Sequence, residues 1–426
     1  MTVDKIKEIN SIFYTSFRQL VKKPHSLAMC YLIFFMRLVE NIIRLRFHYK
    51  KVGRILFFVP SLNNKKSVKT ILDNLKIDGI TIYGIPKMDL PYARCYLTSL
   101  RGLHLFQKLY SKSTKDDKLL MRQFFEDFMN TYGLYYTIDK ILRENPQLKL
   151  IVLANDHITS CRCLIELAEK YDIKTLYVQH ASITERFPPL HFSYSFLDGM
   201  ETYDKYKTIG DMRGKVFLTG SPRFDELYDY KSTEKNYDIG VALNMLDSCN
   251  IAVNLCNYLR DKVSRNIIVR PHPRMGELFD IDAFRSIDIK ISDPTKESSF
   301  AFLSKVKFLI ANESSIHLDS ALIGVPSILY NFSSQEVMDW YSYVKNGMVN
   351  VCTSKDEVEK ELNNHHICPV DRIQYYNASF GTSIEGSVGA FIANFIEDYL
   401  NKSEEEALCN INTMMCDNGE YYVIRK

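Results

Sequence analysis

Two series of short apolar segments, each alternating with helix-like segments, constrain the fold more than any other feature of the chain. The segments are almost continuously apolar, which is typical of parallel strands that are buried on both faces of a sheet. Strands that alternate with helices predict a parallel sheet covered by helices. The first series comprises residues 55–59, 79–83, 148–153 and 175–178, and the second comprises residues 239–243, 266–269, 308–310 and 327–330. We therefore expect an α/β protein with two Rossmann-like domains.

The length of the chain agrees with two domains, because single hydrophobic cores rarely grow beyond about 250 to 300 residues and this chain has 426. The boundaries follow from where each series begins and ends. We predict an N-terminal helical segment at 1–50, a first Rossmann-like domain at 51–230, a second at 231–400 and a C-terminal tail at 401–426. A helical stretch at 92–145 lacks strand signals and is expected to cap the first domain.

The N-terminal segment combines basic residues with an apolar run at 27–36. This run is shorter than the roughly 20 residues that a membrane-spanning helix requires. Two interpretations stay open: residues 1–50 lie on a membrane surface, or they pack on the protein core with a basic outer face. No small-residue cleavage site follows the run, so we expect no cleavable signal peptide. The expected location is the cytoplasm, with peripheral contact to the inner face of the cytoplasmic membrane as an option.

Composition excludes several other classes of protein. The net charge of +3 is small, and no zinc-finger or RNA-binding signature occurs, so we expect no nucleic-acid partner. The ten cysteines are scattered without a CxxC pair, as in a cytosolic protein with reduced thiols. Cys161 and Cys163 would point to different faces of a helix, so packing explains them better than a metal site does. We expect neither a metal nor a cofactor.

Polar residues follow the ends of two strands in the first domain. Asn155 and Asp156 come shortly after residues 148–153, and His180 follows residues 175–178. Ligands of open parallel sheets bind just beyond the carboxyl ends of the strands. Asp156 or His180 could act there as a general base for an acceptor hydroxyl. Asn155 is expected to contact the acceptor. The alternatives are a helix cap for Asp156 and a buried structural role for His180.

The loop that follows His180 is long enough to contact an acceptor. Its candidate acceptor-side residues are Glu185, Arg186 and His191. A pair of prolines in the same loop could instead make it only a rigid connection.

A phosphate site is expected in the second domain. Ser314 and Ser315 open a helix, where free backbone N–H groups, the helix dipole and two hydroxyls favour an anion. Glu313 precedes them in the same loop. One of the serines could also serve only as a helix cap.

A histidine loop in the same domain is the second candidate for phosphate binding. His272 follows residues 266–269, and its prolines, Pro273 among them, stiffen the loop. The imidazole ring could donate to a phosphate oxygen. Arg270 and Arg274 add positive charge for a nucleotide, although surface ion pairs explain them equally well.

These residues resemble the motifs of bacterial GT-B glycosyltransferases that build surface polysaccharides from cytidine-activated donors. The sialyltransferases and Kdo transferases of this group carry an acidic motif in the N-terminal domain. A His-Pro motif and a Ser-Ser or Ser-Thr motif follow in the C-terminal domain. The same order is found here in Asp156, His272-Pro273 and Ser314-Ser315.

The chain is also similar to CDP-glycerol and ribitol phosphotransferases. Their strand-His-Gly segment matches His180-Ala181, with alanine in place of the usual glycine. Their Gly-x-Pro-Arg segment matches residues 220–223, which adds Ser221 and Arg223 to the donor-binding candidates. The resemblance covers about residues 150–390.

The resemblance implies a GT-B fold with a cleft between the two domains. It also implies an inverting, metal-independent transfer of an acidic sugar, sialic acid or Kdo, from a CMP donor to a lipooligosaccharide, capsule or O-antigen chain. The partners would be a nucleotide sugar and a glycan or lipid-linked glycan. The nearest alternative is a CDP-polyol phosphotransferase. A nucleotide-sugar epimerase or a non-catalytic binding module can have the same fold and is the second alternative.

Overall fold

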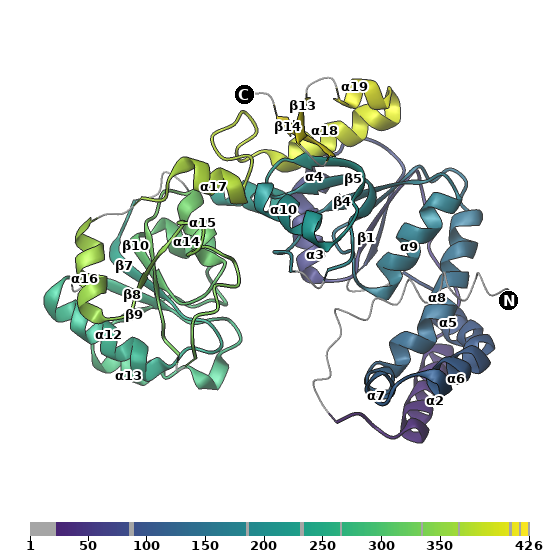
Figure 1. Ribbon diagram of the computed structural model, residues 1–426, viewed down its shortest axis with the longest axis horizontal. Coiled ribbons are helices and arrows are strands. Elements are labelled where there is room, and N and C mark those ends of the chain that lie inside the picture. The colour runs from purple at the N-terminus through teal and green to yellow at the C-terminus, as the bar shows by residue number, and fades with distance from the viewer. Residues whose placement is uncertain are drawn as a thin grey trace. The chain divides into compact units, whose positions relative to one another are not determined.

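The chain forms two compact units (Figure 1). The computed structural model describes residues 23–84, 89–184, 187–230, 234–264, 266–333, 335–364, 367–408, 411–416 and 419–424. The first unit comprises Met1–Leu197, Glu201–Ser221 and Gly389–Arg425, and the second comprises Asp198–Met200 and Pro222–Val388. Each unit contains one predominantly parallel sheet with helices, which confirms the prediction of two Rossmann-like domains.

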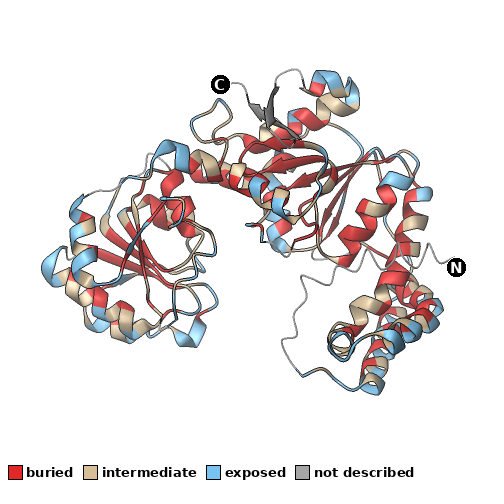
Figure 2. Cartoon of the chain, viewed as in Figure 1, coloured by how far each residue is buried: buried red, intermediate tan, exposed pale blue. Residues whose placement is uncertain are grey.

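The sheet of the first unit has eight strands in the order β13-β14-β6-β5-β4-β3-β1-β2. They are β1 (Ile55–Val59), β2 (Ile80–Gly84), β3 (Leu150–Leu153), β4 (Lys174–Val178), β5 (His191–Leu197), β6 (Arg213–Leu218), β13 (Ile411–Cys416) and β14 (Gly419–Ile424). Neighbouring strands run parallel, except that β13 pairs antiparallel with β14. β1 and β3 are buried at every position, as their continuous apolar sequence predicts (Figure 2).

The helices around this sheet come from distant parts of the chain. They are α3 (Leu62–Ser67), α4 (Lys69–Asn74), α9 (Thr159–Lys170), α10 (Met200–Ile209), α18 (Val388–Asn401) and α19 (Glu404–Leu408). The predicted second domain extends to residue 400 and a tail follows it, whereas the structure assigns Gly389–Arg425 to the first unit, including the strands β13 and β14 of its sheet. The physical reason is aromatic packing: the ring of Phe395 in α18 lies 5.2 Å from those of Tyr194 and Phe196 in β5.

A group of helices near the N-terminus forms its own apolar core within the first unit. It contains α2 (Leu27–Ile43), α5 (Tyr92–Ser99), η1 (Leu100–Gly102), α6 (Leu103–Lys112), α7 (Lys115–Gln123) and α8 (Phe125–Arg143). Phe34, Phe106 and Phe125 meet in this core, with ring centroids of Phe106 and Phe125 4.9 Å apart. Residues 1–22 of the predicted N-terminal segment lie outside the described residues. Within the described part of the chain, no helix is long and apolar enough to cross a membrane.

The second unit has a six-stranded, fully parallel sheet in the order β12-β11-β10-β7-β8-β9. The strands are β7 (Tyr237–Ala242), β8 (Ile267–Arg270), β9 (Lys290–Ile291), β10 (Val306–Ala311), β11 (Ser327–Tyr330) and β12 (Asn350–Cys352). Successive residues of β10 belong to different core clusters: Leu309 packs in one and Ile310 in the other. The sheet therefore has an apolar core on each face, which explains its continuously apolar strands.

Helices and short 3-10 turns connect these strands. They are η2 (Pro222–Phe224), α11 (Asp225–Tyr228), α12 (Cys249–Lys262), η3 (Gly276–Leu278), α13 (Ile281–Ser286), α14 (Ser299–Ser304), α15 (Ile316–Leu322), α16 (Lys355–Asn364) and α17 (Val370–Tyr376). β7 lies between β8 and β10 in the sheet, so the loops after these three strands reach the same edge.

Candidate functional site

The carboxyl ends of β3 and β4 bring the predicted residues of the first unit to one edge of its sheet. Asn155 uses its side-chain oxygen to accept the backbone N–H groups of His157, at 3.1 Å, and Ile158, at 3.0 Å. Asn155 therefore shapes the turn that leads into α9. The side chain of Asp156 takes no part in this turn, so the helix-cap alternative for Asp156 is not what the structure has.

Asp156 is a buried acceptor of two side-chain hydrogen bonds. Its side chain is 1% exposed. One carboxylate oxygen accepts the hydroxyl of Tyr206 at 2.8 Å, and the other lies 2.9 Å from Nδ1 of His157. Burial, together with the nearby Asp156 charge, raises the pKa of Tyr206 well above its usual value, so the phenol stays a donor. The expectation that Asp156 itself faces the acceptor is corrected here, because protein groups shield both of its oxygens.

His157 lies between the Asp156 carboxylate and solvent. Its side chain is 14% exposed. Its Nε2 lies 3.3 Å from the side-chain nitrogen of Asn155, which can only donate, so Nε2 is the acceptor and Nδ1–H donates to Asp156. The His157 ring lies alongside that of His180, 6.3 Å between centroids, and meets Phe187 edge-on at 5.1 Å. The buried carboxylate fixes the tautomer in which Nε2 is the unprotonated ring nitrogen, the form that a general base needs. An acceptor hydroxyl that used this base would take the place of the Asn155 amide as the donor to Nε2.

His157 is not among the predicted site residues, although the sequence carries a signal for it. Three polar residues in a row, Asn155 to His157, follow β3 where ligands of such sheets bind. Only the side-chain contacts distinguish the carboxylate that is enclosed from the imidazole beside it.

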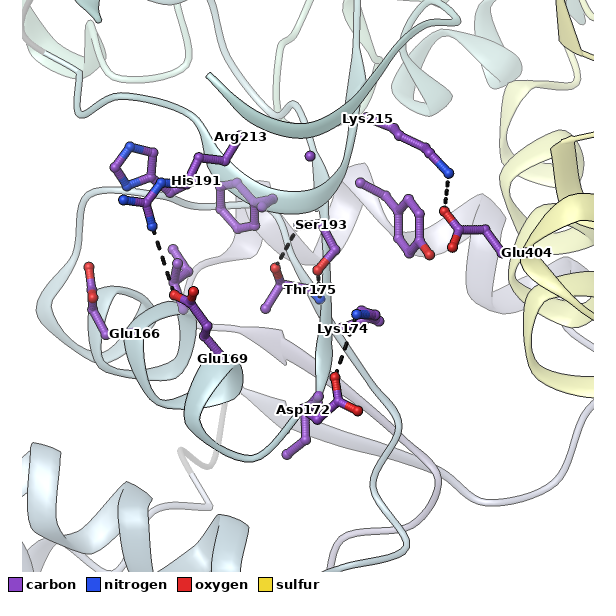
Figure 3. A pocket seen from close by; sticks show the side chains of 15 residues that line it. Glu166, Glu169, Asp172, Lys174, Thr175, His191, Ser193, Arg213, Lys215 and Glu404 are labelled. Atoms are coloured by element: carbon purple, nitrogen blue, oxygen red, sulfur yellow. Dashed lines mark hydrogen bonds and ion pairs between the residues drawn. The ribbon is translucent and has the colours of Figure 1, made fainter. Parts of the chain in front are cut away.

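Of the predicted acceptor-side residues that the structure describes, Asn155 lies at this edge and His191 does not. Glu185 and Arg186 lie outside the described residues. His191 is the first residue of β5, which runs parallel to β4, so His191 lies at the amino edge of the sheet, opposite the edge that carries His180. It lines a cavity of about 390 Å³ there, next to Arg213 (Figure 3). Burial and the Arg213 charge lower the pKa of His191.

Arg270, at the end of β8, has a structural role in the second unit. One guanidinium nitrogen donates to the hydroxyl of Ser292 and another to the carbonyl of Glu297, both at 2.8 Å. The side chain is buried and ties two loops together. The prediction of Arg270 as a nucleotide ligand is therefore corrected, because the side chain is buried and both terminal nitrogens donate within the protein.

His272 keeps a donor available for a ligand. Its Nδ1 accepts the backbone N–H of Arg274 at 3.1 Å, so the neutral ring carries its proton on Nε2. Burial and the charge of Arg274 lower the pKa of His272, which keeps the ring neutral at pH 7. Pro273 and Arg274 are exposed beside it. The predicted donation to a phosphate oxygen is compatible with this geometry.

The loop before α15 holds the remaining donor-side candidates. Glu313 accepts the backbone N–H groups of Met338, at 3.0 Å, and of Trp340, so its carboxylate anchors a neighbouring loop. Ser315 is the N-cap residue and makes no side-chain cap bond. The hydroxyl of Ser314 accepts the backbone N–H of Ile316 at 3.4 Å. Both serines are half-buried.

Asp247, which the sequence analysis does not identify, positions this loop. Its carboxylate accepts the backbone N–H of Asn244 at 2.6 Å and the side-chain amide of Asn312 at 2.7 Å. Asp247 follows β7, the strand between those that lead to His272 and Ser314. His272 and Ser314 therefore lie on the same edge of the second sheet.

The two remaining candidates belong to different units. Ser221 ends a segment of the first unit and is buried. Arg223 lies in η2 of the second unit, with its guanidinium carbon 4.3 Å from the centre of the Phe224 ring. Its positive charge lowers the pKa of Asp319, which places Arg223 near α15.

Among the described residues, no group of three or more His, Cys, Asp or Glu side chains could hold a metal ion.

Two buried ionisable residues in α15 have opposite pKa shifts. His317 lies next to the serine loop, with its Nε2–H donating to the Asn312 carbonyl at 3.0 Å. Burial lowers the pKa of His317 from 6.5 to about 4. Burial also raises the pKa of Asp319 from 3.8 to about 6, against the opposing effect of Arg223.

These shifts predict opposite pH dependences of stability. The contribution of His317 is present above its unfolded pKa and is lost as the pH falls toward 4, whereas that of Asp319 is present at low pH and is lost as the pH rises through 6. Relative to the unmodified protein, a change from pH 7 to pH 5 should lower the unfolding free energy of Asp319→Asn by about 1 kcal/mol and raise that of His317→Gln by about 2 kcal/mol. Denaturant unfolding at both pH values measures this. Parallel pH profiles of the two variants would contradict the shifts.

Comparison with known proteins supports the fold. No family model and no curated protein matches this chain. The UDP-GlcNAc 2-epimerase of Neisseria meningitidis bound to UDP-GlcNAc has a similar structure, with a TM-score of 0.51, 12% identity, and coverage of 82% of this chain and 99% of the epimerase. The epimerase of Methanocaldococcus jannaschii has a TM-score of 0.49, 12% identity and coverage of 80% and 99%. The wall teichoic acid polymerase TagF has a TM-score of 0.47, 12% identity and coverage of 90% and 100%. The chain thus has the GT-B type of fold, with two Rossmann-like domains.

Proposed function

We propose that this protein is a glycosyltransferase that moves an acidic sugar, of the sialic acid or Kdo type, from a CMP-activated donor to a glycan acceptor. The observation that carries the proposal is the buried Asp156 that holds His157 as a base at the carboxyl edge of the first sheet. The GT-B type of fold and the resemblance to cytidine-dependent transferases give further support. The acceptor would be a lipooligosaccharide, capsule or O-antigen chain.

In the proposed reaction, Nε2 of His157 takes the proton from an acceptor hydroxyl. The hydroxyl oxygen attacks the anomeric carbon while the bond from that carbon to the phosphate oxygen breaks, and CMP leaves with the electron pair. Attack opposite to the leaving group inverts the anomeric configuration. Asp156 stabilises the imidazolium that forms, and His180 beside it is suited to bind the carboxylate of the donor sugar.

The second unit supplies the groups for the leaving nucleotide. The neutral His272 donates from Nε2 to a phosphate oxygen, and the exposed Arg274 adds positive charge. Ser314 and Ser315 offer two hydroxyls on the same sheet edge. This set of donors needs no divalent metal, so we expect turnover to persist in the presence of a chelator.

A nucleotide-sugar epimerase is the second candidate. The similarity in fold to the epimerase that was solved with UDP-GlcNAc favours it. A donor assay separates the candidates, together with the CDP-polyol alternative: CMP-sialic acid, CMP-Kdo, CDP-glycerol and UDP-GlcNAc are each supplied with and without acceptor glycans. Acceptor-dependent release of CMP supports the proposal, and conversion of UDP-GlcNAc without any acceptor supports the epimerase.

A screen of nucleotides by thermal unfolding tests the donor class. We expect CMP or CDP to raise Tm while UDP and GDP do not, because a ligand that binds only the folded state stabilises it by about 2.7 kcal/mol at a hundred times its Kd. His272→Ala should remove most of this rise. His191→Ala is the matched control, since it changes the same residue type at the amino edge of the other sheet. Stabilisation by UDP alone would rule out a cytidine donor.

A further inference from the structure

One face of α2 exposes a continuous row of apolar side chains. Cys30, Phe34 and Leu38 face the core of the first unit, and Phe34 is fully buried. The exposed apolar residues follow a spacing of three and four, which places them together on the other side of the helix. They are Met29, Leu32, Met36, Val39 and Ile43, which we call the α2 apolar face; their exposed fractions are 43%, 53%, 63%, 52% and 72%. The pale blue residues along α2 in Figure 2 include this face.

Basic residues border the α2 apolar face. From Lys23 to Lys51, the chain contains six lysines and arginines but one acidic residue, Glu40. The whole chain has a net charge of +3, from 54 basic and 51 acidic residues. The rest of the protein is therefore slightly acidic, and the positive charge is concentrated around α2.

A cavity of about 600 Å³ lies beside α2, lined by four lysine or arginine side chains and by the acidic Glu40, Asp89 and Glu126. Arg37 and Arg44 of α2 line it and share Glu40 as their ion-pair partner. Arg46 and Lys50 line it as well, from the segment that follows the helix. Positive charge and apolar surface therefore adjoin each other on the same helix, and a partner that fits must be both apolar and anionic.

We propose that the α2 apolar face docks this protein on a membrane that contains anionic phospholipids. The helix would lie in the plane of the interface, with its apolar side chains among the acyl chains and Arg46 and Lys50 against lipid phosphates. α2 has 17 residues, and no helix in the described part of the chain can span a bilayer, so the contact is peripheral. A second protein copy would bury the apolar row but would bring like charges together.

Vesicle sedimentation tests the proposal with the full-length protein. We expect binding to vesicles of three parts phosphatidylcholine and one part phosphatidylglycerol, and much weaker binding to phosphatidylcholine alone. Met36→Gln with Ile43→Gln should weaken binding at least tenfold, since two apolar side chains no longer enter the interface. Glutamine is a good helix former, so α2 should be retained, which circular dichroism checks. Leu278→Gln with Ile367→Gln, at equally exposed positions of the second unit, should have no effect.

A second pair of variants tests the charged part of the surface. Arg46→Gln with Lys50→Gln should lower binding roughly fivefold for each charge removed. High salt should also lower the binding of the unmodified protein, because it screens these charges. Lys345→Gln with Lys360→Gln serves as the control for the loss of two exposed charges. Equal binding of the α2 variants and the unmodified protein would overturn the proposal. Dimerisation that the α2 variants abolish, without vesicle binding, would also overturn it. Nucleotide binding is measured separately, so a failure here is distinct from a failure of the proposed activity.

Discussion

His157→Ala is expected to lower kcat by about 10² to 10⁴ while nucleotide binding persists, because the variant loses the base but keeps the groups of the second unit. His157 donates one of the two side-chain hydrogen bonds of the buried Asp156, so its removal should also cost about 1 to 3 kcal/mol of stability, which the Tm of the free variant measures. The measurement is kcat with saturating donor and acceptor, together with the Tm rise that the nucleotide produces. His191→Ala is the matched control at the opposite edge of the sheet and should keep normal kcat.

Asp156→Asn tests whether the carboxylate acts through His157. An amide nitrogen at this position can donate to Nδ1, which would leave the proton of the neutral ring on Nε2, where it blocks the base. We expect a fall in kcat similar to that of His157→Ala, with KM and nucleotide binding nearly unchanged. Normal kcat in His157→Ala, combined with a large loss in His180→Ala, would move the base to His180.

The order of residues along a strand predicts a sheet edge, but not which side chain there is enclosed. The apolar runs predict β3 and β4 because a strand buried on both faces needs apolar residues at every position. They also bring Asp156 and His180 to one edge correctly. The hydroxyl of Tyr206, distant in sequence, closes over Asp156 and leaves His157 as the more exposed group. No local pattern reports such a contact.

On the donor side too, the sequence predicts contacts between neighbouring residues but not contacts between residues far apart in the chain. His272 lies on the expected edge with its Nε2–H available, because the position and tautomer depend on neighbouring residues. Arg270 has the expected position but donates to Ser292 and to the Glu297 carbonyl, which come from later in the chain. A basic residue at a strand end is therefore a weak predictor of a ligand contact.

The assignment of α18 to the first unit could not be predicted for a related reason. The helix follows the last elements of the second unit along the chain, so the local pattern indicates that it continues that domain. Its packing depends on residues distant in sequence, above all the aromatic side chains of β5 and β6 in the first unit.

Phe395→Ala is expected to destabilise the first unit by about 3 to 5 kcal/mol, the usual cost of removing a buried aromatic side chain. Phe395 is 3% exposed, and its ring lies 5.2 Å from Phe196 and 5.3 Å from Phe217, in adjacent strands of the first sheet. The alanine would leave a cavity between α18 and this sheet. Asn394→Ala, at the exposed neighbouring position of the same helix, is the control and should change stability by less than about 0.5 kcal/mol.

Hydrogen exchange resolves which unit loses stability in Phe395→Ala. Amide protection should fall in β5 and β6, because their side chains contact the deleted ring. Protection in β7 and β10 should stay unchanged, since these strands belong to the core of the second unit. Amide exchange reports local opening free energies, so a loss confined to one sheet is readily distinguished from global unfolding. If protection falls in β10 and not in β5, α18 packs on the second unit, as the order of elements along the chain alone would predict.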